Sequence, residues 1–204
     1  MKKILIMISG RGSNMEAIAE NVKTGILKEV CEITEVFSNK RDATGLQIAE
    51  SMDLNTVAID SKGKKRKTYK KLLLEHLTDL KPDYIVLAGY MKIIPAAIIR
   101  SFPNRIINIH PADTDMHQGL HGYDWAFENK LKETKVTVHF VDEGLDTGKV
   151  IGKKEVDIAN CKTLAEVEKE GLKVEHKFYS ECLKKILTAK IAKTLRKEKE
   201  RKAN

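Results

Sequence analysis

Apolar and polar positions alternate in blocks along the chain, and the blocks predict strands and helices in turn. Short apolar runs rich in β-branched residues predict strands, whereas apolar residues three and four positions apart predict amphipathic helices. The predicted strands are residues 2–8, 29–39, 55–60, 83–90, 105–110, 134–142 and 149–158. The predicted helices are residues 13–25, 42–53, 65–80, 95–102, 123–132 and about 163–193, the last with a break near Gly171.

The order of these segments predicts the fold class. Strand and helix alternate through residue 110, a pattern typical of a mostly parallel sheet with helices on both faces. Residues 134–142 then alternate apolar and polar positions, and the turn from Gly144 to Gly148 joins them to strand 149–158. We therefore predict an α/β, Rossmann-like fold with antiparallel strands near the C-terminal end and a long terminal helix.

Length and composition favour one domain in a reducing compartment. The 204 residues show no repeat and no linker, so we predict a single domain over 1–190 and a basic tail over 191–204. The three cysteines are widely spaced and form no CxxC pair, which fits the cytoplasm. No apolar run approaches the length of a membrane span.

The net charge of +8 is concentrated in two stretches. Residues 62–71 hold seven Lys or Arg and no acid, and residues 184–204 hold nine Lys or Arg and two Glu. A basic tail can contact nucleic acid or anionic lipid, but a solvated helix end has the same composition. We expect the second of these for the tail.

The first candidate site is ISGRGSNMEAI at residues 8–18. A strand runs into a glycine turn and then into a helix, so free N–H groups near Ser13 and Asn14 can bind an anion close to Gly12. The stretch is neither GxGxxG nor GxxxxGK[ST], which favours a monophosphate over a dinucleotide or a nucleoside triphosphate. A capped strand–helix turn without a ligand is the alternative.

The second candidate site is INIH at residues 107–110. Asn108 and His110 lie two positions apart on a predicted strand, so they share a face at the edge where open α/β sheets bind ligands. Asn can donate to an oxyanion, and His can move a proton near neutral pH. Asp146, in the turn after the next strand, can orient His110, although a hairpin turn also favours Asp and Gly.

Metal binding is the rival reading of this region. It contains His110, Asp113, Asp115, His117 and His121, but their spacing matches no zinc motif. We therefore expect no metal.

Six motifs, in order along residues 3–180, resemble the phosphoribosylglycinamide formyltransferase family. They are SGRGSN (9–14), FSNKRDATGL (37–46), VLAGYMKII (86–94), NIHP with GLHG (108–122), TVHFVDEGLDTGKVI (137–151) and VEHKFY (174–179). The resemblance implies transfer of the formyl group of 10-formyltetrahydrofolate to the amine of phosphoribosylglycinamide in de novo purine biosynthesis, without a metal.

The resemblance also implies a role for individual residues. The substrate would be bound by Gly12, Ser13, Asn14, Leu172, Lys173, Val174 and Glu175. The folate would be bound by Arg66, Met91, Lys92, Ile93, Ile94, Asn108, Asp142, Glu143, Gly144, Leu145 and Asp146. The catalytic residues would be Asn108, a protonated His110, and Asp146, which keeps His110 cationic. The basic stretch 62–71 would attract the glutamate tail of the folate, although a solvated helix start has the same composition.

The chain departs from the family at a few positions. Residues 112–115 read Ala-Asp-Thr-Asp where the family usually has Ser-Leu-Leu-Pro, Lys92 replaces an Arg, and Ser180 replaces a Pro. If Asp113 and Asp115 approach His110, they should raise its pKa.

Two further functions remain open. A related formyl-folate enzyme would use another amine or water as the acceptor. A protein of a different class would bind anions or nucleic acid through the basic tail. We expect small-molecule partners, neither membrane nor nucleic acid, and a monomer or homodimer.

Overall fold

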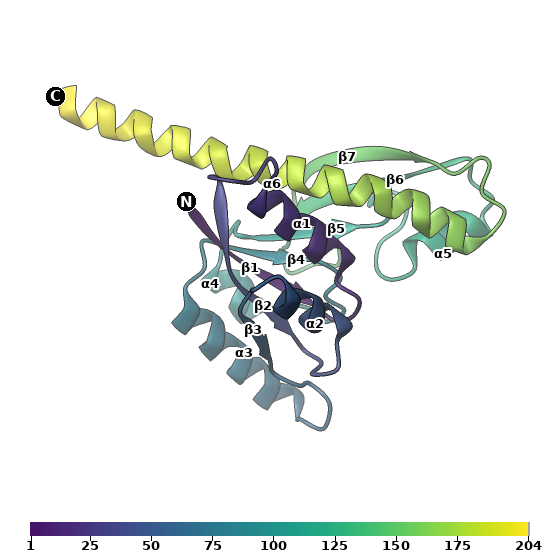
Figure 1. The fold of residues 1–204 in the computed structure, drawn as a ribbon, viewed down its shortest axis with the longest axis horizontal. Helices are drawn as coiled ribbons and strands as arrows, with labels where there is room; N and C mark the ends of the chain where they lie inside the picture. Colours follow the sequence, from purple (N-terminus) through teal and green to yellow (C-terminus); the bar gives the residue numbers. More distant parts are fainter. Residues whose placement is uncertain (204) are drawn as a thin grey trace.

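The computed structural model describes the backbone of residues 1–203 and the side chains of residues 1–189. Its strands form one seven-stranded sheet in the order β3-β2-β1-β4-β5-β6-β7 (Figure 1). They are β1 (Lys2–Ile8), β2 (Cys31–Ser38), β3 (Thr56–Ala58), β4 (Tyr84–Leu87), β5 (Ile106–His110), β6 (Glu133–Phe140) and β7 (Val150–Asp157). Strands β1 to β5 are parallel, and β6 runs antiparallel to both β5 and β7. The predicted fold class is confirmed.

Helices cover both faces of the sheet (Figure 1). They are α1 (Ser13–Lys23), α2 (Thr44–Ser51), α3 (Arg66–Leu80), α4 (Ala96–Ser101), α5 (Gly122–Glu128) and α6 (Leu164–Ala203). One hydrophobic core joins the sheet to α1, α2, α5 and α6, and the other joins it to α3 and α4. None of the described helices combines the length and the apolarity needed to cross a membrane.

The position of β1 inside the sheet, between the two cores, explains why its sequence is apolar at successive positions. Ile4 and Ile6 lie in the first core, and Leu5 and Met7 lie in the second. Because successive side chains of a strand point to opposite faces, a strand covered on both sides needs apolar residues throughout. All four side chains are fully buried, and each contributes about 1.5–3 kcal/mol to folding.

The terminal helix α6 differs from its prediction because it is not broken near Gly171. A Cβ at Gly171 would overlap the ring of Tyr123, so this glycine permits close packing of α6 on α5. Ser180, where the resembling family has Pro, lies inside the same unbroken helix. The predicted boundary between residues 190 and 191 also falls within α6, and the side chains of the basic tail lie outside the described residues.

Tyr179 of α6 ties this helix to the strand ends that carry the candidate site. Its fully buried hydroxyl lies 2.9 Å from the Leu87 carbonyl oxygen and 3.0 Å from that of Ile107. These carbonyls belong to β4 and β5, directly before the point where the cavity opens. The VEHKFY motif therefore has a structural role at the edge of the site.

Candidate active site

A cavity of about 500 Å³ lies at the C-terminal ends of β4 and β5. Four segments line it: the stretch after β4, the end of β5, residues 119–121, and the turn after β6. Most residues predicted to bind folate are in this lining, namely Met91, Lys92, Ile93, Ile94, Asn108, Asp142, Glu143, Gly144, Leu145 and Asp146. The structure therefore brings together segments that are more than fifty positions apart.

The mouth of the cavity is apolar. Met91, Ile93, Leu120 and Leu145 are all more than half exposed and all line the cavity. Exposed apolar side chains around a concave site are typical of a surface that receives a flat apolar ligand. The cavity floor, in contrast, carries the polar groups of Asn108, His110 and Asp146.

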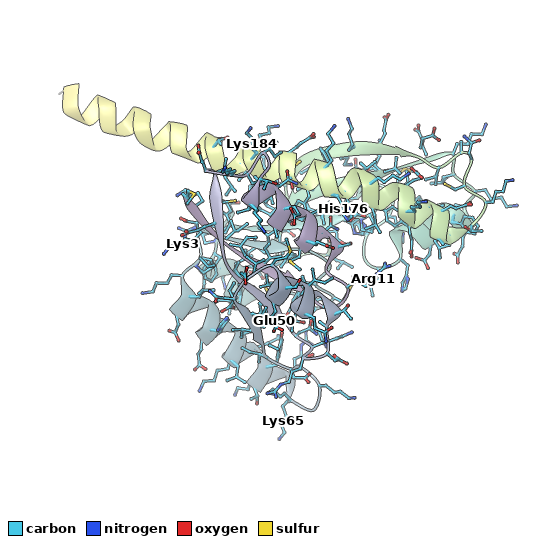
Figure 2. All side chains as sticks on the ribbon, viewed as in Figure 1. Lys3, Arg11, Glu50, Lys65, His176 and Lys184 are labelled. Atoms are coloured by element: carbon cyan, nitrogen blue, oxygen red, sulfur yellow. The ribbon has the colours of Figure 1, made fainter. Side chains whose placement is uncertain are left out.

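Arg66 is not among the residues that line this cavity. It is the first residue of α3. Figure 2 shows its neighbour Lys65 well apart from Arg11 of the glycine turn. Its contact with a folate tail stays a prediction, and the tail would have to extend beyond the cavity.

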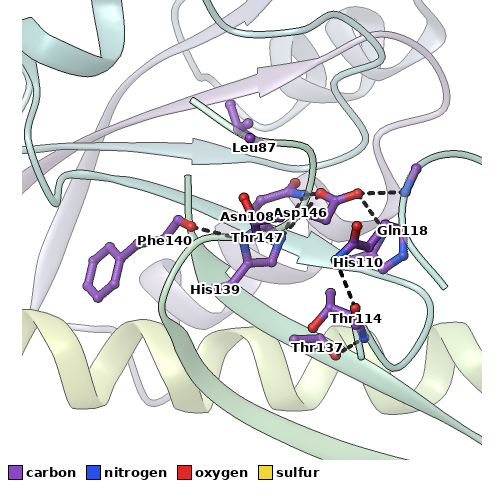
Figure 3. A network of polar contacts seen from close by, with 12 residues as sticks. Leu87, Asn108, His110, Thr114, Gln118, Thr137, His139, Phe140, Asp146 and Thr147 are labelled. Atoms are coloured by element: carbon purple, nitrogen blue, oxygen red, sulfur yellow. Dashed lines mark hydrogen bonds and ion pairs between the residues drawn. The ribbon is translucent and has the colours of Figure 1, made fainter. Parts of the chain in front are cut away.

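Asn108 presents its amide nitrogen to the floor of the cavity. Its Nδ2 lies 3.3 Å from Nε2 of His139 and 3.4 Å from Oδ1 of Asp146 (Figure 3). Both distances are long for hydrogen bonds with N–H donors. The two amide hydrogens are therefore weakly held and can turn toward a stronger acceptor in the cavity.

His110 is oriented by a main-chain carbonyl. Its Nε2 lies 3.1 Å from the carbonyl oxygen of His117. Because a carbonyl only accepts hydrogen bonds, we assign the hydrogen of the neutral ring to Nε2. Nδ1 is then the nitrogen that gains and loses a proton, and it lies 3.5 Å from Oδ2 of Asp146.

Burial sets the resting charge of His110. Desolvation lowers its pKa below the ordinary 6.5, and the nearby His139 and His117 act in the same direction. Asp146 and the bond to the His117 carbonyl oppose the shift without cancelling it. The lowered pKa favours the neutral ring at pH 7, whereas the family resemblance implied a protonated His110 in the reaction.

Asp146 is held as a carboxylate by its neighbours. Burial alone would raise its pKa, but hydrogen bonds with His139 and Gly119, together with the charge effect of His110, lower it below 3.8. The Gly119 amide donates to Oδ2 at 2.9 Å, so the GLHG segment fixes this carboxylate. The backbone of Asp146 has a φ of 53°, a left-handed conformation that Asp tolerates better than most residues.

His139 completes the cluster and was not among the predicted residues. It lies directly opposite Asn108 in the β5–β6 pairing. Its Nδ1 lies 2.9 Å from the Phe140 carbonyl oxygen, and its Nε2 lies 3.3 Å from Nδ2 of Asn108 and 3.4 Å from Oδ1 of Asp146. The alternation in residues 134–142 gave the face of His139, but only the register of the two strands places it beside Asn108.

The carboxylates of the loop at 112–115 face away from His110. Asp113 is buried and pairs with Lys153 of β7 and, at 3.0 Å, with Lys135 of β6. Asp115 lies 2.7 Å from Lys153. The condition for a raised His110 pKa, an approach of these carboxylates to the ring, is therefore not met, because the two lysines bind them instead. Burial would raise the pKa of Asp113, yet the hydrogen bonds from Lys153 and Lys135 lower it to about 2.

The glycine turn forms a second polar site beside the first residues of α1. Gly12 has a φ of 79° and contacts Gly45, where a Cβ would come within 2.9 Å of the neighbouring backbone. Among the described side chains, none caps the N–H groups that begin α1. These free donors fit the predicted anion site at Gly12, Ser13 and Asn14.

Glu175 joins this site to α6 and α5. It accepts a hydrogen bond from Asn14 Nδ2 at 2.6 Å and another from the Tyr123 hydroxyl. The Oδ1 atom of Asn14 is buried and has no hydrogen-bond partner within the described residues. Of the predicted neighbours Leu172, Lys173 and Val174, Lys173 is exposed and bonds Glu170 at 2.6 Å. Asn14 is therefore held in place by Glu175, with one buried acceptor atom that has no partner among the described residues.

No group of three or more His, Cys, Asp or Glu side chains among the described residues is arranged to hold a metal ion.

Comparison with known proteins gives the family. The formyl transferase family model matches residues 2–183. A phosphoribosylglycinamide formyltransferase of Bacillus subtilis (strain 168) is 33% identical over 92% of this chain and 95% of its own length. One from Escherichia coli (strain K12) is 38% identical over 76% of this chain and 73% of its own length.

Solved structures agree. Glycinamide ribonucleotide transformylase 1 from Symbiobacterium toebii superposes with a TM-score of 0.87 at 30% identity, covering 93% of this chain and 89% of its own. The phosphoribosylglycinamide formyltransferase from Bacillus halodurans gives a TM-score of 0.85 at 33% identity, covering 91% of this chain and 95% of its own. The chain therefore belongs to the formyl transferases and, among them, to the phosphoribosylglycinamide formyltransferase family.

Proposed function

We propose that this protein transfers the formyl group of 10-formyltetrahydrofolate to the amine of phosphoribosylglycinamide in purine biosynthesis. The observation that carries the proposal is the convergence of Asn108, His110 and Asp146 on the floor of one cavity, in a chain of this family. The proposal places the protein in the cytoplasm, in line with its three free cysteines.

The folate would occupy the 500 Å³ cavity. Its flat ring system would lie against the apolar side chains of Met91, Ile93 and Leu145. Its formyl-bearing nitrogen would face the cavity floor, where the amide of Asn108 and the ring of His110 are available. The chain between Asp142 and Asp146 closes the other wall of the cavity and would contact the polar edge of the ring.

The phosphate of the second substrate would bind at the start of α1. The free N–H groups after Gly12 and the positive end of the helix dipole favour an anion there. Glu175 holds the side-chain amide of Asn14 in place beside these N–H groups.

The reaction then follows from the groups on the cavity floor. The amine attacks the formyl carbon, and the former carbonyl oxygen becomes an oxyanion that accepts a hydrogen bond from Asn108 Nδ2. Nδ1 of neutral His110 takes the excess proton from the new ammonium centre, and Asp146 stabilises the resulting imidazolium. The proton passes to the folate nitrogen as its bond to the formyl carbon breaks, giving tetrahydrofolate and the formylated amine. These residues supply the charge and proton steps, so the proposal requires no metal ion.

The test is a formyl-transfer assay with phosphoribosylglycinamide and 10-formyltetrahydrofolate, followed by folate absorbance. We expect turnover by the wild type and its near-complete loss in His110→Ala and Asp146→Asn. Asn129→Ala is the control, since Asn129 is exposed, does not line the cavity, and donates from its side chain to the Trp125 carbonyl. Formate release without the amine would identify water as the acceptor and contradict the proposal.

A further inference from the structure

The loop after His110 is attached to β6 and β7 by a cluster of ion pairs. The Asp113 carboxylate is only 10% exposed, and it lies between Lys135 of β6 and Lys153 of β7. Thr137 of β6 donates to the Ala112 carbonyl at 2.7 Å, beside this cluster. The loop is therefore attached to the antiparallel end of the sheet by charge and by hydrogen bonds.

Asp113 also shapes the turn that follows it. Its carboxylate accepts a hydrogen bond from the Asp115 amide at 3.1 Å. Its main-chain carbonyl accepts from the amides of Met116 and His117, both at 2.9 Å. One residue thus fixes the turn on one side and binds the two lysines on the other.

The turn ends at the carbonyl that orients His110. The His117 amide is bonded to Asp113, and the His117 carbonyl oxygen lies 3.1 Å from Nε2 of His110. The position of this acceptor decides which nitrogen of His110 carries the hydrogen. If it moves away, Nε2 and Nδ1 can both exchange their protons with solvent or substrate.

We propose that Asp113, clamped by Lys135 and Lys153, is a positioning residue that fixes the His117 carbonyl and thereby holds His110 in the tautomer with Nδ1 free. This inference rests on the proposed catalytic role of His110. It gives a function to the carboxylate that the chain has in place of the apolar residue usual in the family.

Among the described residues, the charged and titratable neighbours of His110 and of Asp113 form two separate sets. His110 faces Asp146 from the turn after β6, His139 from β6 and His117 from its own loop. Asp113 faces Lys135, Lys153 and Asp115. The two sets are joined through the main chain of the turn, so the clamp acts on His110 by position rather than by charge.

The direct test is NMR of the imidazole nitrogens in protein labelled with ¹⁵N-histidine. In the wild type we expect His110 to be protonated at Nε2 and unprotonated at Nδ1 when neutral. In Asp113→Asn and in Lys153→Met we expect a mixture of both tautomers. We also expect kcat to fall about tenfold with KM for both substrates nearly unchanged, because the misplaced group acts on the chemical step.

Two matched variants separate positioning from a general loss of structure. Lys153→Arg keeps the charge and should keep the wild-type tautomer and kcat. Asp115→Asn removes a carboxylate from the same loop, and we expect no change because that side chain is 81% exposed. If Asp113→Asn does not fold, Lys153→Met tests the proposal instead. This variant should fold, because Lys153 is partly exposed and Asp113 still has Lys135 as a cationic partner.

Folded variants that retain the wild-type tautomer would overturn the inference. A wild type without formyl transfer, but with tautomers that respond to Asp113→Asn as expected, would contradict the proposed function and leave the clamp intact.

Discussion

The Nδ1 atom of His110 lies 3.5 Å from Oδ2 of Asp146, on the side of the ring that faces away from the His117 carbonyl. The two nitrogens of this ring therefore have different tasks. Nε2 keeps its hydrogen in the bond to the His117 carbonyl, and Nδ1 faces the Asp146 carboxylate and exchanges its proton. The predictions on pH and on the neighbouring residues follow from this division.

The first prediction concerns pH. The proposed base is neutral His110, whose pKa burial lowers below 6.5. We expect kcat/KM to be constant from this pKa up through pH 7 and to fall as the pH drops through it. In Asp146→Asn the residual activity should show its acid limb at lower pH, because removal of the carboxylate disfavours the imidazolium. The comparison with wild type cancels the titration of the substrate amine, and a limb at higher pH would contradict the assignment.

The second prediction concerns Asn108. Its two long hydrogen bonds, at 3.3 and 3.4 Å, leave it free to bind an oxyanion more strongly than it binds its present partners. We expect Asn108→Ala to lower kcat by about 10²–10³-fold, the loss typical of a missing oxyanion donor. KM for both substrates should change little, and Asn129→Ala is again the control. A change confined to KM would show that Asn108 only binds the folate.

The third prediction concerns His139. Its Nε2 lies 3.3 Å from Asn108 Nδ2 and 3.4 Å from Oδ1 of Asp146. Substitution by Phe removes this ring nitrogen from between the Asn108 amide and the Asp146 carboxylate, and we expect kcat to fall about tenfold, the equivalent of about 1.4 kcal/mol. The pKa of Asp146 should rise toward its ordinary value, since His139 contributes to lowering it. His139→Gln keeps a polar group in the strand and should lose less.

Asn108 and His139 show which parts of the site can be predicted from the sequence. Asn108 and His110 could be predicted together because two residues apart on one strand always share a face. His139 could not, since its partner is set by the register of β5 on β6, which no local pattern encodes. The charge of Asp113 likewise suggested an effect on His110, but its partners come from two later strands.

The fourth prediction concerns the phosphate site. Glu175 accepts hydrogen bonds from Asn14 and Tyr123, and it is 5% exposed. We expect Glu175→Gln to raise KM for the phosphorylated substrate about tenfold, because a neutral amide holds Asn14 less firmly than a carboxylate does. KM for the folate should stay the same. Glu181→Gln, at an exposed position of the same helix, is the control. Equal changes in both KM values would mean that the whole site had moved.

The last prediction concerns acid stability and the Asp113 clamp. The pKa of Asp113 in the folded protein is about 2, against an ordinary 3.8. The stabilisation is therefore complete at pH values above 3.8 and is lost as the pH falls through about 2. The difference corresponds to about 2 kcal/mol in the free energy of unfolding at neutral pH.

Urea unfolding at several pH values measures this contribution of Asp113 to the free energy of unfolding. At pH 7 we expect Asp113→Asn to be less stable than the wild type by about 2 kcal/mol, and the difference should shrink as the pH approaches about 2. Asp115→Asn should lie within about 0.5 kcal/mol of the wild type throughout, because its carboxylate is exposed and bonds only one of the two lysines. A difference for Asp113→Asn that is independent of pH would mean that the substitution acts through packing of the loop, since only the ionised carboxylate can make the stability depend on its own protonation.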